Sequence, residues 1–172
     1  MLPNEFKNLV LQLNDKLLRF AVHLLGDKED AKDVVQEVFM KLWQRKNSLV
    51  EVKNTQAYVM QITRNCCINM LRNRQIKVKT DEILLEGKTK ANDLVSEIEL
   101  SETASIIKKL IDELPAIQRT TMYLRDIEQY EYEEIAEIID QNINYVRVTL
   151  SRARKNVREK LQKKHDYGFK DY

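Results

Sequence analysis

Basic side chains are concentrated between residues 141 and 164, where eight lysines and arginines accompany one acid, Glu159. The local net charge is +7, and the cations are Arg147, Arg152, Arg154, Lys155, Arg158, Lys160, Lys163 and Lys164. Such side chains bind a polyanion by neutralising its phosphates, and their N–H groups can also donate hydrogen bonds to base edges. The chemistry indicated is nucleic-acid recognition. A solvated amphipathic helix with a basic face is the alternative, and charge alone does not separate the two.

A helix-turn-helix would position these side chains. At roughly 100° per residue one stripe of the segment is apolar and suits a small core; it consists of Ile143, Val146, Leu150, Ala153, Val157 and Leu161. The residues predicted to meet DNA are Asn144, Tyr145, Arg147, Val148, Ser151, Arg152 and Lys155. A shorter apolar pattern precedes the polar break at residues 140–142 and consists of Ile135, Ala136, Ile138 and Ile139. A short helix, a tight turn and a second, outward-reading helix are typical of this motif.

Composition predicts an all-α protein. Of the 172 residues 33% are charged, and the chain holds 3 glycines and 2 prolines, a balance that favours helices throughout. The net charge of +2 hides a segregation, because residues 126–140 hold seven acids and no base directly before the basic segment. We expect two small helical domains joined by a linker, the C-terminal one a helix-turn-helix.

The cysteines and the hydropathy predict the compartment. Cys66 and Cys67 are adjacent, which strains an ordinary disulfide, and they are too few for a zinc site. A reducing cytoplasm is the simplest location for them. No apolar run approaches the roughly 20 residues that span a bilayer, and the N-terminus lacks the apolar region of a signal peptide. We therefore expect a soluble protein that is not exported.

Two amphipathic helices are predicted in the N-terminal region. The first carries apolar residues at intervals of three and four and ends at Gly26, where a left-handed cap would lie. Asp27 can cap the second, which runs to Trp43. The outer face of the second helix mixes both charges, as solvated faces commonly do, but an exposed Trp43 would suit a protein-binding edge.

A third helix, capped by Thr55, is predicted to run to about Arg74. Its buried side is expected to be Val59, Ile62, Thr63, Cys66, Cys67 and Met70. Its other side carries Tyr58, Gln61, Arg64, Asn65, Ile68, Asn69 and Arg72. Residues 52–80 hold six bases and no acid. Amide and aromatic side chains among arginines suit contact with unstacked bases as well as phosphates.

Domain boundaries follow from changes in composition. Residues 79–101 are net acidic with weak periodicity and are expected to form a linker, partly helical towards its end. Helical spacing resumes at Glu102, and Pro115 ends that helix because the residue before a proline is pushed out of the α region. A further helix is expected at about residues 116–126. The predicted domains are therefore residues 1–78 and 102–165, with a tail at 166–172.

Ordered motifs in these elements resemble those of bacterial RNA polymerase sigma factors. The motifs are the segment from Asp30 to Trp43, Ala57-Tyr58-Val59 through Arg64-Asn65 to Leu71-Arg72, Leu114-Pro115, Glu134-Ile135-Ala136-Glu137, and Leu150-Ser151-Arg152-Ala153-Arg154. The resemblance is closest to the small extracytoplasmic-function (ECF) group of the sigma-70 family and is weakest over residues 76–100. Asp140 stands where relatives usually have Gly, and Asp tolerates the left-handed conformation better than most residues.

The resemblance implies a role for each helix. The surface formed by Asp33, Gln36, Glu37, Phe39 and Trp43 would bind core RNA polymerase at the clamp helices of the β′ subunit, with further contacts to the β subunit. Promoter DNA would be opened and read at the minus-ten element by Asn54, Tyr58, Gln61, Arg64, Asn65 and Arg72. The DNA-facing residues of the last helix would read the minus-thirty-five element. Many relatives are held by an anti-sigma protein, often anchored in the inner membrane.

Two other classes of function were weighed. A helix-turn-helix regulator that does not replace a sigma factor would need a ligand pocket or a phospho-acceptor domain, and residues 1–75 show neither a βα alternation nor a Gly-rich loop. A nucleic-acid enzyme would need metal-binding or nucleophilic clusters, whereas His23 and His165 are far apart in sequence. We therefore expect a promoter-specificity subunit with no catalytic residues, no metal ligands and no cofactor.

Overall fold

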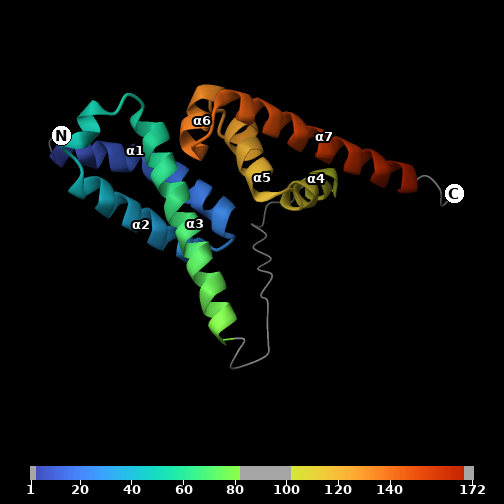
Figure 1. Cartoon of the computed structure of the whole chain (residues 1–172), viewed down its shortest axis with the longest axis horizontal. Coiled ribbons are helices and arrows are strands. Elements are labelled where there is room, and N and C mark those ends of the chain that lie inside the picture. The colour runs from blue at the N-terminus through green and yellow to red at the C-terminus, as the bar shows by residue number, and fades with distance from the viewer. Residues whose placement is uncertain (1–2, 82–101, 169–172) are drawn as a thin grey trace. The chain divides into compact units, whose positions relative to one another are not determined.

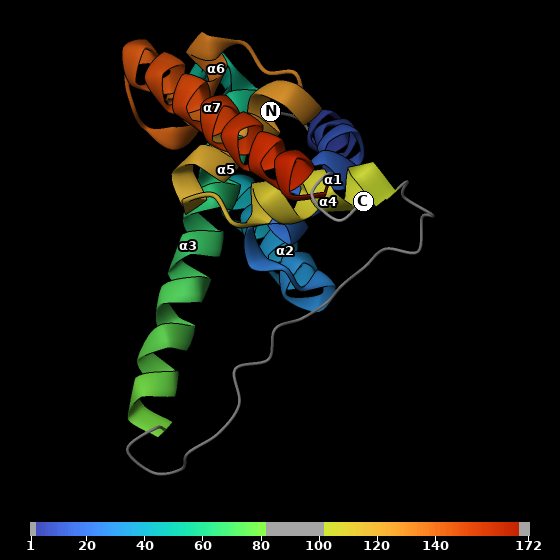
Figure 2. The same cartoon turned by 90° about the vertical axis from the view of Figure 1, so that its right-hand side faces the viewer.

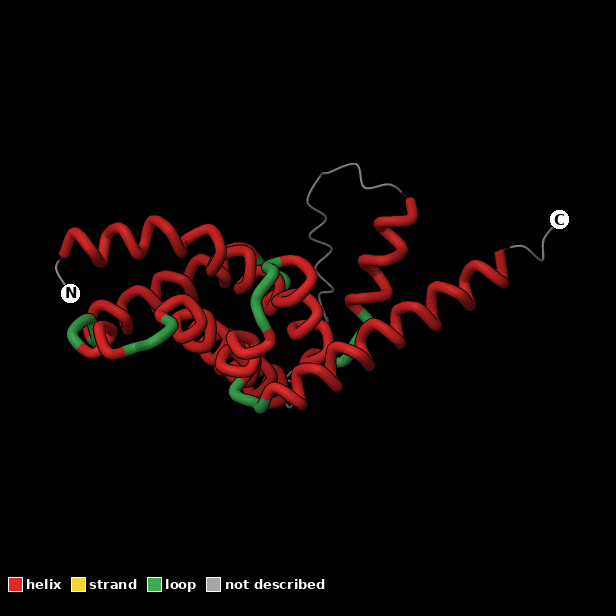
Figure 3. Tube along the Cα trace, turned by 90° about the horizontal axis from the view of Figure 1, so that it is seen from above, coloured by secondary structure: helices red, strands yellow, loops and turns green. Residues whose placement is uncertain are grey.

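The computed structural model describes residues 3–81 and 102–168 of the chain, which divides into two compact units, residues 1–94 and 95–172 (Figure 1). Every regular element in the described residues is helical, which confirms the all-α, two-domain prediction (Figure 3). Most of the predicted linker, from residue 82 to residue 101, lies outside the described residues. Among the described helices, none is long and apolar enough to cross a membrane.

The first unit is a three-helix bundle. Helices α1 (Pro3–Leu25), α2 (Lys28–Gln44) and α3 (Thr55–Asp81) contact one another, and a short 3-10 helix, Ser48–Glu51, lies between α2 and α3. The largest fully buried side chains of this unit are Leu17, Phe20, Val34, Val38, Leu42 and Met60. The C-terminal part of α3 projects beyond the other two helices in both views (Figures 1 and 2).

The corner between α1 and α2 forms as predicted. Gly26 has a φ of +70°, which a residue without a Cβ adopts at little cost, and its amide donates to the carbonyl of Val22 at 2.8 Å. The carboxylate of Asp27 then accepts from the amide of Asp30 at 2.9 Å. This hydrogen bond satisfies one of the amides exposed at the start of α2.

The start of α3 differs from the prediction. Asn54, not Thr55, is the cap, because its side-chain oxygen accepts from the amide of Ala57 at 3.0 Å and Thr55 is already helical. The helix also continues to Asp81, past the predicted end at Arg74. Both differences concern only the ends of the helix. At the start, Asn and Thr are both favoured capping residues. At the end, no Gly or Pro near residue 74 indicates where the helix stops.

The second unit is organised around α7 (Ile143–Gly168). Helices α4 (Glu102–Asp112), α5 (Ala116–Met122) and α6 (Tyr132–Ile139) all contact it. Pro115 separates α4 from α5 as predicted. A buried cluster joins α4 to the middle of α7 and consists of Leu110, Leu114, Ala153 and Val157.

The helix predicted for about residues 116–126 is present, but its last part is not α-helical. A π-helical turn, Tyr123–Ile127, follows α5, and Gln129 has a φ of +60° before α6 begins. The amide of Tyr130 donates to the carbonyl of Leu124 at 2.9 Å, which closes the turn. Hydrophobic periodicity does not distinguish an α turn from a π turn, since the difference lies in backbone hydrogen bonding.

The turn of the helix-turn-helix has a left-handed residue at its centre. Asp140 has φ 56° and ψ 53°, and the amide of Gln141 donates to the carbonyl of Ala136 at 3.0 Å. Asn142 then caps α7, its side-chain oxygen accepting from the amide of Tyr145 at 2.8 Å. Asp140 therefore supports the turn in the left-handed conformation, and Gln141 is exposed to solvent.

Candidate nucleic-acid interface

Helix α7 separates a buried stripe from an exposed face. Of the predicted stripe, Val146, Leu150, Ala153 and Val157 are buried and Ile143 and Leu161 are half-buried, while Thr149 is an additional buried residue. All seven residues predicted to meet DNA are exposed: Asn144, Tyr145, Arg147, Val148, Ser151, Arg152 and Lys155. Two of them, Tyr145 and Val148, are large apolar groups left 39% and 47% exposed. Such groups at a basic surface suit contact with base edges or thymine methyl groups.

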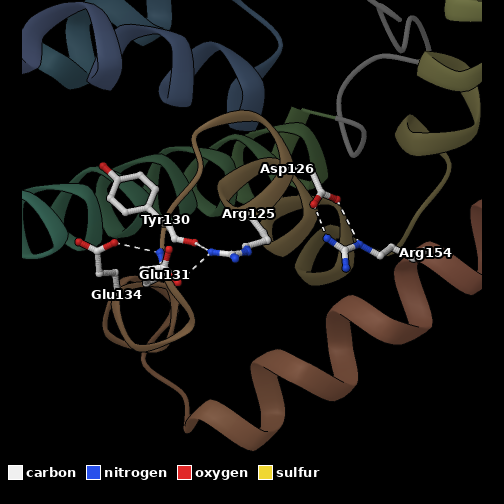
Figure 4. Close-up of polar contacts among 6 residues, drawn as sticks. All are labelled: Arg125, Asp126, Tyr130, Glu131, Glu134 and Arg154. Carbon is white, nitrogen blue, oxygen red and sulfur yellow. Dashed lines mark hydrogen bonds and ion pairs between the residues drawn. The ribbon is translucent and has the colours of Figure 1, made fainter.

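One of the arginines counted in the basic segment has a structural role. The guanidinium of Arg154 forms an ion pair with the carboxylate of Asp126 in the π turn (Figure 4). Hydrogen bonding to Asp126 raises the pKa of Arg154. This arginine is therefore fixed against the unit and does not belong to the DNA-facing set, from which sequence reasoning had also left it out.

The residue before Asp126 fixes α6. Arg125 donates to the carbonyl of Tyr130 at 2.7 Å and lies 3.1 Å from the carboxylate of Glu131 (Figure 4). Its guanidinium also lies 4.9 Å from the centre of the Tyr132 ring. Consecutive residues of the π turn thus hold the two helices of the motif, Arg125 holding α6 and Asp126 holding α7. Helical periodicity gave no signal of this arrangement.

The outer face of α2 carries the predicted polymerase-binding residues. Asp33, Gln36, Glu37 and Trp43 are exposed, and Phe39 is half-buried. The Trp43 ring is 42% exposed; it packs edge-on against Phe6 with ring centres 5.0 Å apart, and the ammonium of Lys46 lies 3.8 Å from its centre. These contacts hold an aromatic side chain at the surface in a fixed position, which suits a protein-binding anchor.

Sequence reasoning missed Met40 on this face. Its side chain is 64% exposed and lies three and four residues from Glu37 and Gln36, so it shares their side of the helix. The sequence pattern assigned Met40 neither to the core side of the helix nor to its outer face. Its exposure would have been visible from the sequence only by placing the core stripe more narrowly, on Val34, Val38 and Leu42.

The predicted minus-ten residues lie along α3 with different degrees of exposure. Asn65 and Arg72 are exposed, Tyr58, Gln61 and Arg64 are half-buried, and Asn54 is the helix cap. A small pocket of about 200 Å³ opens between α2 and α3 and is lined by Lys41, Arg45, Ile62, Asn65, Cys66 and Asn69. Amides and cations around a small opening could hold a polar planar group. Arg74, counted among the bases of this surface, is paired with Asp30 of α2.

Both cysteines are free and buried, which confirms that they belong to the core. The Cys66 sulfur lies 3.3 Å from the ammonium of Lys41, yet burial outweighs that contact and raises the pKa of the Cys66 thiol. Burial, with a smaller contribution from Cys66, raises the pKa of Cys67 to about 12. Within the described residues no group of three metal-binding side chains occurs.

Comparison with known proteins matches both units to one family. Residues 9–76 match Sigma-70 region 2, and residues 104–157 match Sigma-70, region 4. The RNA polymerase sigma factor SigV of Bacillus subtilis (strain 168) is 32% identical over 149 residues, which cover 84% of each chain. The RNA polymerase sigma-H factor of Pseudomonas aeruginosa is 26% identical over 166 residues, 91% of this chain and 86% of the relative.

A solved structure gives the same result. The sigma factor RpoE, seen in complex with the anti-sigma factor NepR from Bartonella quintana, is 28% identical and superposes with a TM-score of 0.72 over 92% of this chain and 97% of its own. CnrH, solved in complex with the cytosolic domain of CnrY, shares the fold at 19% identity with a TM-score of 0.61. The chain therefore belongs to the sigma-70 family of RNA polymerase sigma factors and, within it, to the ECF group.

Proposed function

We propose that this sigma factor binds core RNA polymerase through the exposed face of α2 and gives the enzyme its promoter specificity through α3 and α7. In this assignment residues 1–78 dock on the polymerase and open and read the minus-ten element. Residues 102–165 anchor on the minus-thirty-five element. Neither step is catalytic, because bond formation takes place in the core enzyme and this chain supplies recognition.

The observation that carries the proposal is the face of α7. Its seven predicted DNA-facing residues are all exposed, and the residues opposite them are packed against α4, α5 and α6. A helix held along one side with cations, amides and apolar groups on the other is suited to enter a major groove. One acid of α7, Glu159, pairs with Lys155 at 3.7 Å. Glu133, Glu137 and Asp140 line an open hollow beside the turn.

The polymerase partner is proposed from α2. Asp33, Gln36 and Glu37 offer hydrogen-bond acceptors and a donor, and Trp43 with Met40 offers apolar area. The clamp helices of the β′ subunit are the proposed partner of this face, with further contacts to the β subunit. Interfaces of this composition derive most of their affinity from a few buried anchors, with aromatic residues prominent among them.

The minus-ten element is assigned to α3. Arg64, which is half-buried, and Arg72, which is exposed, are eight residues apart on one helix and can follow the backbone of a single strand. Tyr58, Gln61 and Asn65 lie along the same helix and could stack on, or bond to, unpaired bases. Asn54, whose side-chain oxygen caps the helix, is assigned to the same surface.

A helix-turn-helix regulator that does not replace a sigma factor is not favoured, because residues 9–76 match Sigma-70 region 2. An anti-sigma protein is a proposed partner, since RpoE was solved with the anti-sigma factor NepR. The proposed location is the cytoplasm, where core polymerase and chromosomal DNA are present.

The test is reconstituted transcription. Core polymerase with the full chain should produce discrete transcripts from a library of genomic fragments of the source bacterium, and core alone should not. A triple variant, Ser151→Ala, Arg152→Ala, Lys155→Ala, should assemble with core and lose those transcripts. Transcripts that do not depend on the chain, or a triple variant with the same promoter set, would contradict the proposal.

A further inference from the structure

Two arginines lie on the same flank of α7. Arg147 and Arg154 are seven residues apart, about two turns of helix; Arg147 lies near Tyr132 of α6, and Arg154 pairs with Asp126 of the π turn. Arg154 is committed to Asp126, as described above. Both side chains contribute one positive charge to the basic segment, but the guanidinium of Arg154 is already used in an ion pair within the unit.

Arg147 is exposed and rests on an aromatic ring. Its guanidinium carbon lies 5.8 Å from the centre of the Tyr132 ring, which is near the outer limit for attraction between a cation and a ring. That contact involves the face of Tyr132 and leaves the N–H groups of Arg147 able to donate elsewhere. In the described part of the chain, Arg147 takes part in no ion pair, in contrast to Arg154.

The Tyr132 ring is itself fixed by a second cation. The guanidinium of Arg125 lies 4.9 Å from the ring centre and is held by the carbonyl of Tyr130 and the carboxylate of Glu131. Two guanidinium groups near one ring repel each other, since both keep their positive charge. Because Glu131 balances the charge of Arg125, the ring can accept Arg147 as well.

We propose that Tyr132 is a positioning residue, which holds the guanidinium of Arg147 at the edge of the DNA-reading face so that it donates to a phosphate of the upstream promoter element. The inference rests on the proposed function of α7. Restricting the side chain before binding reduces the conformational entropy that the contact costs. Tyr132 touches no DNA in this arrangement and acts through Arg147.

The test is a double-mutant cycle on the holoenzyme assembled from core polymerase and the full chain. The probe is a duplex selected from random-sequence DNA by the wild-type holoenzyme. Tyr132→Leu should weaken binding about two- to fivefold, the range expected for an exposed contact between a cation and a ring. Tyr132→Phe keeps the ring face and should bind like the wild type. In an Arg147→Ala background, Tyr132→Leu should cause no further loss.

The alternatives give different results. Equal weakening by Tyr132→Leu with and without Arg147 would mean that Tyr132 supports the fold of the motif, and would overturn the inference. So would an Arg147→Ala variant that binds as tightly as the wild type. A wild-type holoenzyme that selects no sequence at all would instead overturn the proposed function, and the inference with it. Thermal unfolding of each variant shows whether Tyr132→Leu still folds. If it does not, Tyr132→Gln, which has a long side chain without a ring, takes its place in the cycle with the same expected results.

Discussion

Asp126 in the π turn forms an ion pair with Arg154 of α7, 28 positions further along the chain. Arg152, two residues before Arg154, lies on the exposed face of the same helix. Of these two nearby arginines, Arg154 is paired with an acid of the same unit, and Arg152 faces solvent. This difference separates a contribution to stability from a contribution to DNA binding.

We predict that Arg152→Ala and Arg154→Ala change different properties. Arg152→Ala should reduce the dependence of log K on log salt by about 0.9 for holoenzyme binding to promoter DNA, the value for one lost phosphate contact. Arg154→Ala should leave that slope unchanged and lower the free energy of unfolding by about 0.5 kcal/mol, because the pair is partly exposed and screened. Filter binding across a salt series and urea unfolding measure the two effects. Equal slopes for both variants would contradict the assignment.

The second prediction concerns polymerase affinity. The double variant Gln36→Ala, Trp43→Ala should weaken binding to core polymerase by about 30-fold or more, since an aromatic anchor and its polar neighbour are worth about 2 kcal/mol. Its circular dichroism should remain that of a helical protein. Gln12→Ala, an exposed change on α1, is the matched control and should bind like the wild type. Unchanged affinity of the double variant in a core pull-down would remove α2 from the interface.

The third prediction concerns DNA opening. Replacing Arg64 and Arg72 with alanine should spare assembly with core polymerase and reduce open-complex formation, seen as lost permanganate reactivity of thymines near the start site. The reason is that these cations follow the backbone of an opened strand. Lys7→Ala on α1 removes an exposed charge from the same unit and should leave the reactivity intact. Persistent reactivity with weaker duplex binding would reassign α3 to double-stranded DNA.

The fourth prediction concerns Asn54, whose side chain caps α3 and is also proposed to contact DNA. Asn54→Ala should lower the free energy of unfolding by about 1 kcal/mol through loss of the cap to Ala57. Asn54→Ser should keep most of that stability. If Asn54 also reads the minus-ten element, the serine variant should still form fewer open complexes. If the serine variant forms open complexes as well as the wild type, Asn54 has only the capping role and does not contact the minus-ten element.

The fifth prediction follows from the Cys67 thiol, whose pKa rises from the ordinary value of 9.0 to about 12 in the folded chain. Below pH 9 the thiol is protonated in both states and its burial contributes fully to stability. Between about pH 9 and pH 12 the unfolded chain loses the proton first, so stability falls with pH. The slope from this one group is at most about 1.4 kcal/mol per pH unit.

Cys67→Ala should therefore show a shallower fall in the free energy of unfolding between pH 8 and pH 10 in urea titrations. Val59→Ala, an equally buried change on the same helix, is the control and should lower stability by an amount that does not vary with pH. Parallel pH profiles for Cys67→Ala and the wild type would show that another group titrates in this range.

Patterns carried by the side chains themselves could be predicted from the sequence. The corner at Gly26 and Asp27 and the buried stripe of α7 each depend on residue types with strong local preferences. The π turn could not be predicted, because Arg125 and Asp126 owe their roles to partners elsewhere in the unit. Pairing of this kind depends on tertiary geometry that no spacing rule encodes.

For the candidate site, the exposure of the seven residues on α7 could be predicted, because an exposed face is the complement of a buried stripe. Their contact with DNA stays a prediction. Asn54 was placed among the DNA contacts although its side chain is already bonded to the backbone of Ala57. Met40 was assigned to no surface, and its exposure depends on which part of the helix packs against α1 and α3.

Left-handed residues stand on both sides of α6, Gln129 before it and Asp140 after it. Each marks a point at which the backbone leaves the helical path, so the length of α6 is set at both ends and the helix cannot grow or slide to absorb a change. One inserted residue within it would rotate Tyr132 by about 100° relative to the turn at Asp140 and carry its ring away from α7. The length of α6 thus fixes the position of Tyr132 relative to α7. Insertions and deletions are therefore expected outside α6 rather than within it.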